Sequence, residues 1–176
     1  MSILNFRPAT AADVPAITAL TNLAYAGNSS EKAWTHEGTL FDEARTNDAE
    51  IAAHIAAPGA MFLLGFDGDQ LVASALLKFT DDAGYLGMLA VHPDLQTGGV
   101  GKQMLAEAEH MAIARGCTKM TMMVIATHRP ELVAYYQRRG YALTGRYGQF
   151  SRAAVKAYAE EIGMRLEWME KKLVAK

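Results

Sequence analysis

The sequence has little cysteine and no excess of basic charge, and each shortage excludes a class of protein. Cys117 is the single cysteine among 176 residues, so an internal disulfide is impossible and a cysteine-based zinc site is unsupported. The formal net charge is −2, which argues against a broad nucleic-acid-binding surface. The five histidines show no metal-ligand spacing, so we predict no metal site.

Long hydrophobic runs are missing as well. No apolar stretch approaches the roughly 20 residues that a membrane-spanning helix needs, and residues 1–8 lack the apolar core of a signal peptide. We therefore expect a soluble, cytoplasmic protein without a membrane partner. Hydrophobic residues still make up 51% of the chain and charged residues 20%, a composition that favours one globular domain over residues 1–176.

Strand-like and helical segments alternate along the chain. Thr10 followed by Asp13 is typical of a capping box, and either Asn47 or Asp48 is expected to cap a second helix. Further helices are predicted from Gly99 to about Gly116, from Pro130 to Gly140 and over residues 151–162. Strands are predicted at residues 3–6, 61–66, 70–79, 85–91, 119–125, 141–144 and 164–168. This order predicts an α/β fold, in which a mixed sheet carries helices on its faces.

The sharpest local signal is a glycine-rich turn between a strand and a helix. It reads Leu89-Ala90-Val91-His92-Pro93-Asp94-Leu95-Gln96-Thr97-Gly98-Gly99-Val100-Gly101-Lys102. A helix start has unpaired N–H groups and partial positive charge, and glycines let the backbone approach an anion, so the turn can hold a pyrophosphate. The P-loop pattern fails because Gln103 follows Lys102, and the dinucleotide pattern fails because Met104 replaces its third glycine.

Two signatures in the right order resemble the GNAT superfamily of N-acetyltransferases. Gln96-x-x-Gly99-x-Gly101 is similar to that family's Q/R-x-x-G-x-G/A motif. One strand and one helix later, the segment 136–141 is similar to its Y-x-x-x-G-F/Y motif. The motifs are confined to residues 86–141, while the element order matches over nearly the whole chain. The resemblance implies a GNAT fold: a mixed, mostly antiparallel sheet of six to seven strands, with helices on both faces and a splayed central strand pair, 85–91 and 119–125.

The resemblance also implies a donor site and a reaction. Acetyl-CoA, the acetyl donor, would lie in the gap between the splayed strands, and a primary amine would attack its thioester directly in a ternary complex. A backbone N–H of the splayed strand would stabilise the oxyanion. Tyr136 would be the general acid that protonates the leaving thiolate. Cofactor-binding groups would come from Leu89, Ala90 and Val91 beside the pantetheine arm, and from Gln96, Thr97, Gly98, Gly99, Val100, Gly101 and Lys102 around the pyrophosphate.

The general base departs from the family pattern. Many relatives carry a glutamate on one of the two splayed strands, whereas residues 85–91 and 119–125 contain no acidic residue. The proton of the acceptor amine would then pass to water or to a remote group such as His36 or Glu37. Arg129 stands where relatives often have asparagine. We expect it to be an exposed residue at a helix start. In an alternative interpretation, its guanidinium contacts a phosphate of coenzyme A. Cys117 is expected to be a structural thiol.

The acceptor wall is expected from residues 25–46 and 145–163. Trp34, Glu37 and Arg45 are predicted to bind the acceptor, with Arg45 suited to a carboxylate and Glu37 to an ammonium. The second segment adds Tyr147, Phe150 and Arg152 as conspicuous groups.

The leading functional hypothesis is acetyl transfer to a primary amine of a small molecule or peptide. Two alternatives stay open: a non-catalytic acyl-CoA-binding or regulatory module on the same scaffold, and transfer of an acyl group longer than acetyl. A homodimer also stays open as the assembly.

Overall fold

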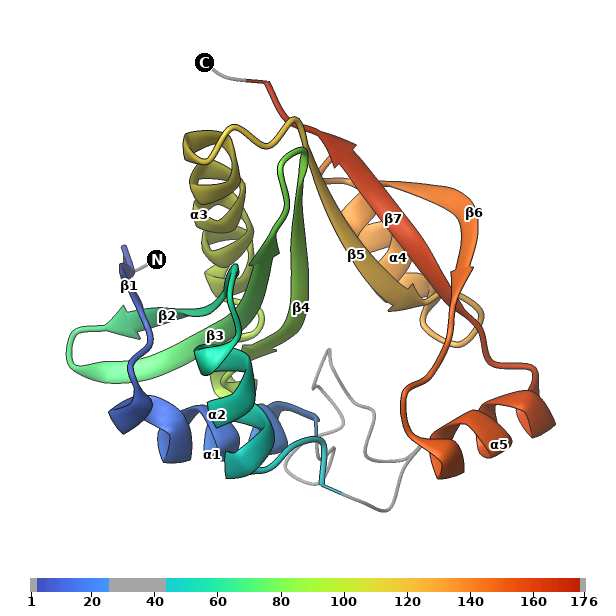
Figure 1. Cartoon of the computed structure of the whole chain (residues 1–176), viewed down its shortest axis with the longest axis horizontal. Coiled ribbons are helices and arrows are strands. Elements are labelled where there is room, and N and C mark those ends of the chain that lie inside the picture. The colour runs from blue at the N-terminus through green and yellow to red at the C-terminus, as the bar shows by residue number, and fades with distance from the viewer. Residues whose placement is uncertain (1–2, 26–43, 175–176) are drawn as a thin grey trace.

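A computed structural model describes residues 3–25 and 44–174, and its element order agrees with the sequence-based prediction (Figure 1). The strands are β1 (Asn5–Pro8), β2 (Ala60–Asp67), β3 (Gln70–Phe79), β4 (Ala83–Val91), β5 (Lys119–Ile125), β6 (Ala142–Gly148) and β7 (Leu166–Lys172). The α-helices are α1 (Val14–Tyr25), α2 (Asp48–Ala56), α3 (Val100–Ala114), α4 (Pro130–Gln137) and α5 (Ala153–Ile162). No helix in the described ranges is long and apolar enough to span a bilayer.

Local capping chemistry fixes where the first two helices begin. The Asp13 carboxylate accepts the Thr10 N–H at 2.7 Å, closing the predicted capping box ahead of a short 3₁₀ turn that continues into α1. Asn47 is the cap of α2, because its side-chain oxygen accepts the Glu50 N–H at 2.9 Å. The structure thereby decides between Asn47 and Asp48.

The seven strands form one sheet in the order β1-β2-β3-β4-β5-β7-β6. All neighbours are antiparallel except β4 and β5, which run parallel and pair only at Ala83–Tyr85 with Lys119–Thr121. Beyond these three pairs the two strands diverge, as Figure 1 shows. The predicted mixed sheet and its splayed central strand pair are confirmed.

Alternation along the strands supplies an apolar face to each helical layer. On one face, Leu63 and Leu77 pack with Met104 of α3 and Val133 of α4. On the other, buried residues of α1 and α2 pack against the sheet, in the cluster Val14, Ile17, Ile51, Phe62, Leu64, Leu76 and Met88.

The C-terminal strands are longer than predicted. We predicted that β6 would end at Thr144, but it reaches Gly148 because a register shift beyond Leu143 lets Tyr147 pair with Glu167. Gly145, at φ 75°, makes the irregular step that a period-two pattern does not reveal.

Candidate active site

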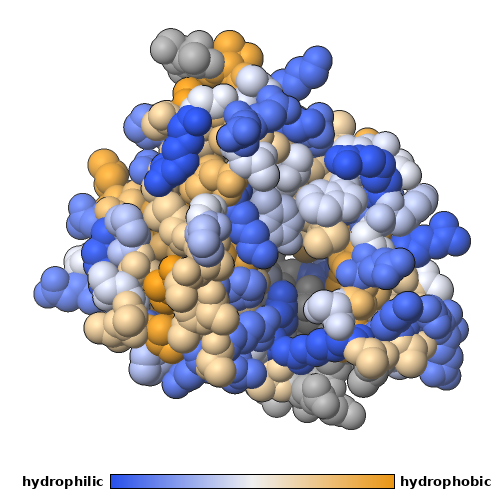
Figure 2. All heavy atoms as spheres, in the orientation of Figure 1, coloured by the Kyte–Doolittle hydropathy of each residue, from blue (hydrophilic) through white to orange (hydrophobic). Residues whose placement is uncertain are grey.

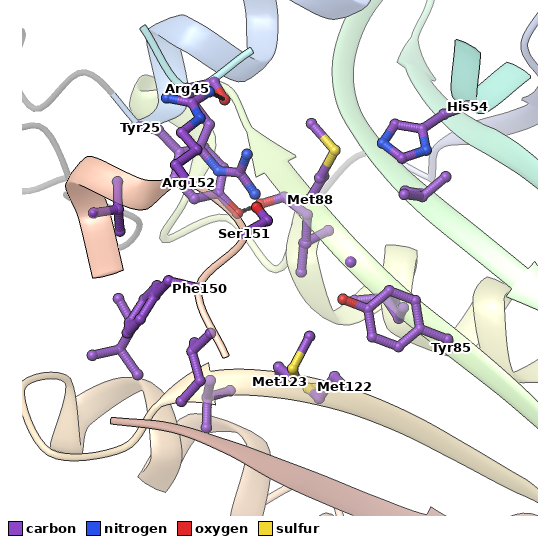
Figure 3. A pocket seen from close by; sticks show the side chains of 18 of the residues that line it. Tyr25, Arg45, His54, Tyr85, Met88, Met122, Met123, Phe150, Ser151 and Arg152 are labelled. Atoms are coloured by element: carbon purple, nitrogen blue, oxygen red, sulfur yellow. Dashed lines mark hydrogen bonds between the residues drawn. The ribbon is translucent and has the colours of Figure 1, made fainter. Parts of the chain in front are cut away.

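A cavity of about 690 Å³ lies where β4 and β5 part. Figure 2 shows this face of the molecule hollowed near its centre, with both hydrophilic and hydrophobic residues around the hollow. Figure 3 shows the side chains that enter the cavity from β4, β5, α1, α2 and the segment that precedes α5. The lining residues come from four regions: Asn22, Tyr25, Ala44, Arg45, Glu50 and His54; Leu76, Lys78 and Tyr85 to Leu89; Met122 to Ile125, Leu132 and Tyr136; and Gln149 to Arg152, Val155 and Leu166.

The glycine-rich turn has the geometry of an anion cradle. Gly99 caps α3 with φ 79°, a left-handed conformation that favours glycine. The first helical hydrogen bond is the Gln103 N–H to the Gly99 carbonyl at 3.1 Å, so the N–H groups of Val100, Gly101 and Lys102 have no acceptor within the helix. A Cβ on Gly101 would lie 2.8 Å from the Tyr135 hydroxyl oxygen. A glycine at this position therefore keeps the helix start close to α4.

The end of β4 is also held by side chains. The Tyr25 hydroxyl donates to the Leu89 carbonyl at 3.0 Å, and the Gln96 side-chain amide donates to the Val91 carbonyl at 3.2 Å. Gln96 thus ties the turn to the preceding strand, a role that motif spacing did not indicate. Because a carbonyl oxygen has two lone pairs, these bonds leave room for a second donor.

A bulge in β4 marks the centre of the cavity. Ser74 faces Ala90 and Leu76 faces Gly87, so Met88 and Leu89 together lie opposite Ala75. Met88 has φ 48°, which is strained for a non-glycine residue and requires support from its surroundings. The bulge turns backbone groups of Met88 and Leu89 out of the β3–β4 ladder at the point where the strands separate.

Tyr136 lines the cavity from the α4 side. Its side chain is buried, and its ring packs edge-on against Tyr135 at 5.3 Å and Tyr141 at 6.0 Å between centroids. Burial, and then the neighbouring hydroxyls of Tyr25 and Tyr135, raise the pKa of Tyr136 above its ordinary value near 10. The phenol is therefore protonated throughout the neutral range, so its proton is present at the cavity wall.

Arg129 corrects one expectation. We predicted an exposed residue at the helix start, but Arg129 is only 7% exposed. Its Nε donates to Glu131 Oε1 at 2.6 Å, and one terminal nitrogen is buried without a hydrogen-bond partner among the described residues. Burial of this cation is tolerated because Glu131, two residues later in the first turn of α4, supplies the opposite charge. The local sequence around Arg129 does not indicate that its guanidinium points into the protein.

The two predicted wall segments meet in space. Arg152 donates to the carbonyls of Ala44 at 3.0 Å and Arg45 at 2.5 Å, although about 107 residues separate them. Arg45 and Phe150 line the cavity with Arg152 (Figure 3). Tyr147 is not among the lining residues and is 59% exposed, with its ring under the Arg165 guanidinium at 5.6 Å. Trp34, His36 and Glu37 lie outside the described residues.

Several cavity residues were missed from the sequence. Glu50 and His54 enter from α2, Lys78 from β3 and Tyr85 from β4. The spacing of Glu50 and His54, four residues apart on one helix, was the available signal, since such residues share a face.

Cys117 is buried, and burial raises the pKa of its thiol, as expected of a structural cysteine. Within residues 3–25 and 44–174, no cluster of three His, Cys, Asp or Glu residues that could hold a metal ion was found.

Solved N-acetyltransferases share the fold of this chain. The Escherichia coli ribosomal-protein-S18-alanine N-acetyltransferase superimposes with a TM-score of 0.72 at 14% identity, over 99% of this chain and 96% of that one. The PaiA N-acetyltransferase of Thermoplasma acidophilum, solved in complex with coenzyme A, gives 0.68 at 19% identity, over 97% and 99%. At these identities the likeness shows the fold.

Residues 25–141 match the model of the acetyltransferase (GNAT) family, so the chain belongs to that family. An acetyltransferase of Sodalis glossinidius is 26% identical over 83 residues, which are 47% of this chain and 58% of that protein. One of Pectobacterium atrosepticum is 31% identical over 64 residues, 36% of this chain and 45% of that protein. The matched part thus spans about half the length of these relatives.

Proposed function

We propose that this protein is an N-acetyltransferase that moves the acetyl group of acetyl-CoA to a primary amine of a small molecule or peptide. The observation that carries the proposal is the parting of β4 and β5 around a cavity, with the glycine cradle beside it and Tyr136 in its wall. Two solved GNAT-fold relatives lend support, since the Thermoplasma enzyme holds coenzyme A and a Salmonella typhimurium homologue holds acetyl-CoA.

The described residues fit this donor. The N–H groups of Val100, Gly101 and Lys102 lack helical acceptors and suit the pyrophosphate, with exposed Thr97 and Gly98 alongside. Lys102 is exposed and adds positive charge near this helix start. We place the pantetheine arm along Leu89, Ala90 and Val91, where β4 has lost β5 as a neighbour.

The chemistry follows from which groups share the cavity. The amine lone pair forms a bond to the thioester carbon while the carbonyl oxygen gains negative charge. An N–H freed by the bulge at Met88 and Leu89 is the donor that we assign to this oxyanion. The nitrogen gives up one proton to a base or to solvent, the C–S bond breaks, and the thiolate takes the proton of the Tyr136 hydroxyl. Solvent returns a proton to the phenolate, and the products are the acetylated amine and the thiol.

We propose further that the acceptor carries an anionic group as well as its amine. Arg45 and Lys78 both line the cavity, and neither has a carboxylate partner among the described residues. Cations that line a cavity suit carboxylates or phosphates, with which they form charge-assisted hydrogen bonds. Trp34 and Glu37 stay in the proposal as acceptor residues.

Arg45→Ala tests this acceptor chemistry. We expect KM for an anionic amine to rise about tenfold or more, because a charge-assisted hydrogen bond is worth about 1.5–3 kcal/mol. KM for its neutral amide analogue and the affinity for acetyl-CoA should stay unchanged. Arg146→Ala, an exposed arginine over Trp168 and outside the cavity, is the matched control. Equal losses with charged and neutral amines would contradict the anionic acceptor.

Thiol release with an amine panel tests the function itself. We expect coenzyme A to be released faster with amines that carry a carboxylate or phosphate than without amine. Parallel runs with propionyl-CoA and butyryl-CoA test the longer-acyl alternative. Calorimetric binding of acetyl-CoA with no thiol release by any amine would instead favour the non-catalytic acyl-CoA-binding module.

A further inference from the structure

His54 is a cavity residue that the proposed chemistry has not yet used. It lies in the last turn of α2, and its ring packs edge-on to Phe62 with centroids 6.3 Å apart. Figure 3 shows the imidazole entering the cavity from the α2 side, with Met88 and Tyr85 on the neighbouring wall. Met88 is the residue at the β4 bulge, so His54 and the proposed oxyanion donors border one space.

Glu50 lies beside the imidazole, one helical turn earlier on α2. Its Oε1 lies 4.0 Å from His54 Nε2, while its Oε2 accepts the Thr46 hydroxyl proton at 2.8 Å. Thr46 is buried, and the Glu50 main-chain N–H is bonded to the Asn47 cap. The carboxylate is therefore anchored at one oxygen and faces the ring with the other.

The surroundings of His54 keep it neutral. Burial lowers its pKa below the usual 6.5, and the positive charges of Lys78 and Arg45 lower it further, while Glu50 opposes them. Tyr85 also faces the cavity, but burial raises the pKa of its phenol and keeps it uncharged. At neutral pH the imidazole thus has a free lone pair.

Few other groups in the cavity can accept a proton. β4 and β5 carry no carboxylate in the stretch that lines it, and among the described lining residues the acidic or imidazole side chains are Glu50 and His54. Glu50 is engaged by Thr46, whereas a ring nitrogen of His54 is turned to the cavity. We propose that His54 is the general base that takes the proton of the acceptor amine, and that Glu50 is a positioning residue that orients it. This inference rests on the proposed acetyltransferase function.

The step balances as follows. The acceptor nitrogen becomes acidic as it bonds to the thioester carbon, and an N–H proton passes to the lone pair of His54. The oxyanion collapses, the C–S bond breaks and the thiolate takes the Tyr136 proton. His54 then releases its proton to solvent, which restores both groups for the next turnover.

His54→Gln is the decisive variant, compared with the wild type in a pH profile of kcat/KM. General base catalysis is typically worth about 10²–10⁴ in rate, so we expect a loss in that range. In the wild type, kcat/KM should rise as His54 loses its proton, at a pH below 6.5. In the variant this limb should be absent, and only the rise with deprotonation of the free amine, which both enzymes share, should remain. Glu50→Gln should give a smaller loss and move the limb to lower pH, since Glu50 raises the pKa of His54.

His110→Gln is the matched control, because His110 is an exposed histidine with its own glutamate one turn away, outside the cavity. Calorimetry with acetyl-CoA should give unchanged affinity in all three variants and shows that each is folded. A His54→Gln enzyme with wild-type kcat/KM and an unmoved limb overturns the role of His54 and leaves the acetyltransferase intact. A wild type that releases no thiol with any amine overturns the proposed function, and the base with it.

Discussion

Tyr135 and Tyr136 are adjacent on α4, yet their side chains lie in different surroundings. Tyr136 is buried and lines the cavity. Tyr135 is turned to the cradle instead, with its hydroxyl against Gly101 and the Arg139 guanidinium stacked 3.4 Å from its ring centroid. Successive helical residues point about 100° apart, so the two phenols have different surroundings. Chemistry at the thioester is expected of Tyr136, and packing of the cradle of Tyr135.

We expect Tyr136→Phe to lower kcat by about 10²-fold, toward the lower end for general acid catalysis, because a coenzyme A thiolate is already a fair leaving group. Burial raises the pKa of Tyr136, so any fall in wild-type kcat from its ionisation should come above pH 10 and be absent in the variant. A pH–rate profile checks both points, with Tyr135→Phe as the control that keeps kcat. Wild-type kcat in Tyr136→Phe would make Tyr136 a packing residue.

At the scale of elements, the junction of β4 and α3 combines three local devices. The strand bulges at Met88, the Gln96 amide fixes the strand end, and Gly99 starts the helix in the left-handed region. Each device sets the course of the main chain next to the point where β4 and β5 part. The cradle is therefore a property of the junction, and side-chain chemistry contributes mainly through Lys102.

We expect Gly99→Glu to abolish most acetyl-CoA binding, because it places a side chain and a negative charge at the cradle. The left-handed backbone adds a stability cost of about 1–2 kcal/mol. Gly116→Glu at the opposite end of α3 is the control, since Gly116 also has a positive φ, 82°, but has open space around it. It should lose similar stability yet bind acetyl-CoA normally, as measured by calorimetry and thermal unfolding. Equal binding by both variants would refute the site.

At the scale of the molecule, the sheet consists of two parts that meet at a short seam. β1 to β4 form one antiparallel part and β5, β7 and β6 the other, and only three residue pairs join β4 to β5. Side chains also pack tightly where the two strands are paired. A Cβ on Gly84 would lie 2.6 Å from Sδ of Met120, its partner on β5. A ligand in the gap would touch both parts.

Amide hydrogen exchange with and without acetyl-CoA tests this bridging. We expect slower exchange at residues 86–91 of β4, at 97–102 of the cradle and at 122–125 of β5. A ligand at 100 times its dissociation constant stabilises the folded state by about 2.7 kcal/mol, so thermal unfolding should also move upward. If acetyl-CoA left the exchange rates of β4 and β5 unchanged and slowed exchange elsewhere, the ligand would bind outside the gap.

The sequence by itself determined the element order, the cap at Thr10 and the glycine-rich start of α3 at Gly99. These features obey short-range rules, because caps, hydrophobic periods and glycine turns involve residues within a few positions of each other. The predicted GNAT-like fold followed from two such local motifs placed in the right order. The bound of β6 was missed because its extension past Gly145 depends on pairing with β7.

Only the tertiary structure decided what faces the cavity. Arg152 reaches the Arg45 carbonyl across about 107 residues, and Arg129 turns inward where the sequence predicted exposure. His54 has a glutamate on the same helix face, but so has the exposed His110, so this spacing alone does not single out His54. It becomes a candidate base because α2 packs over the sheet beside the β4 bulge, which places its ring near Arg45, Lys78 and Met88. Such placement depends on the packing of distant elements, which short-range patterns do not encode.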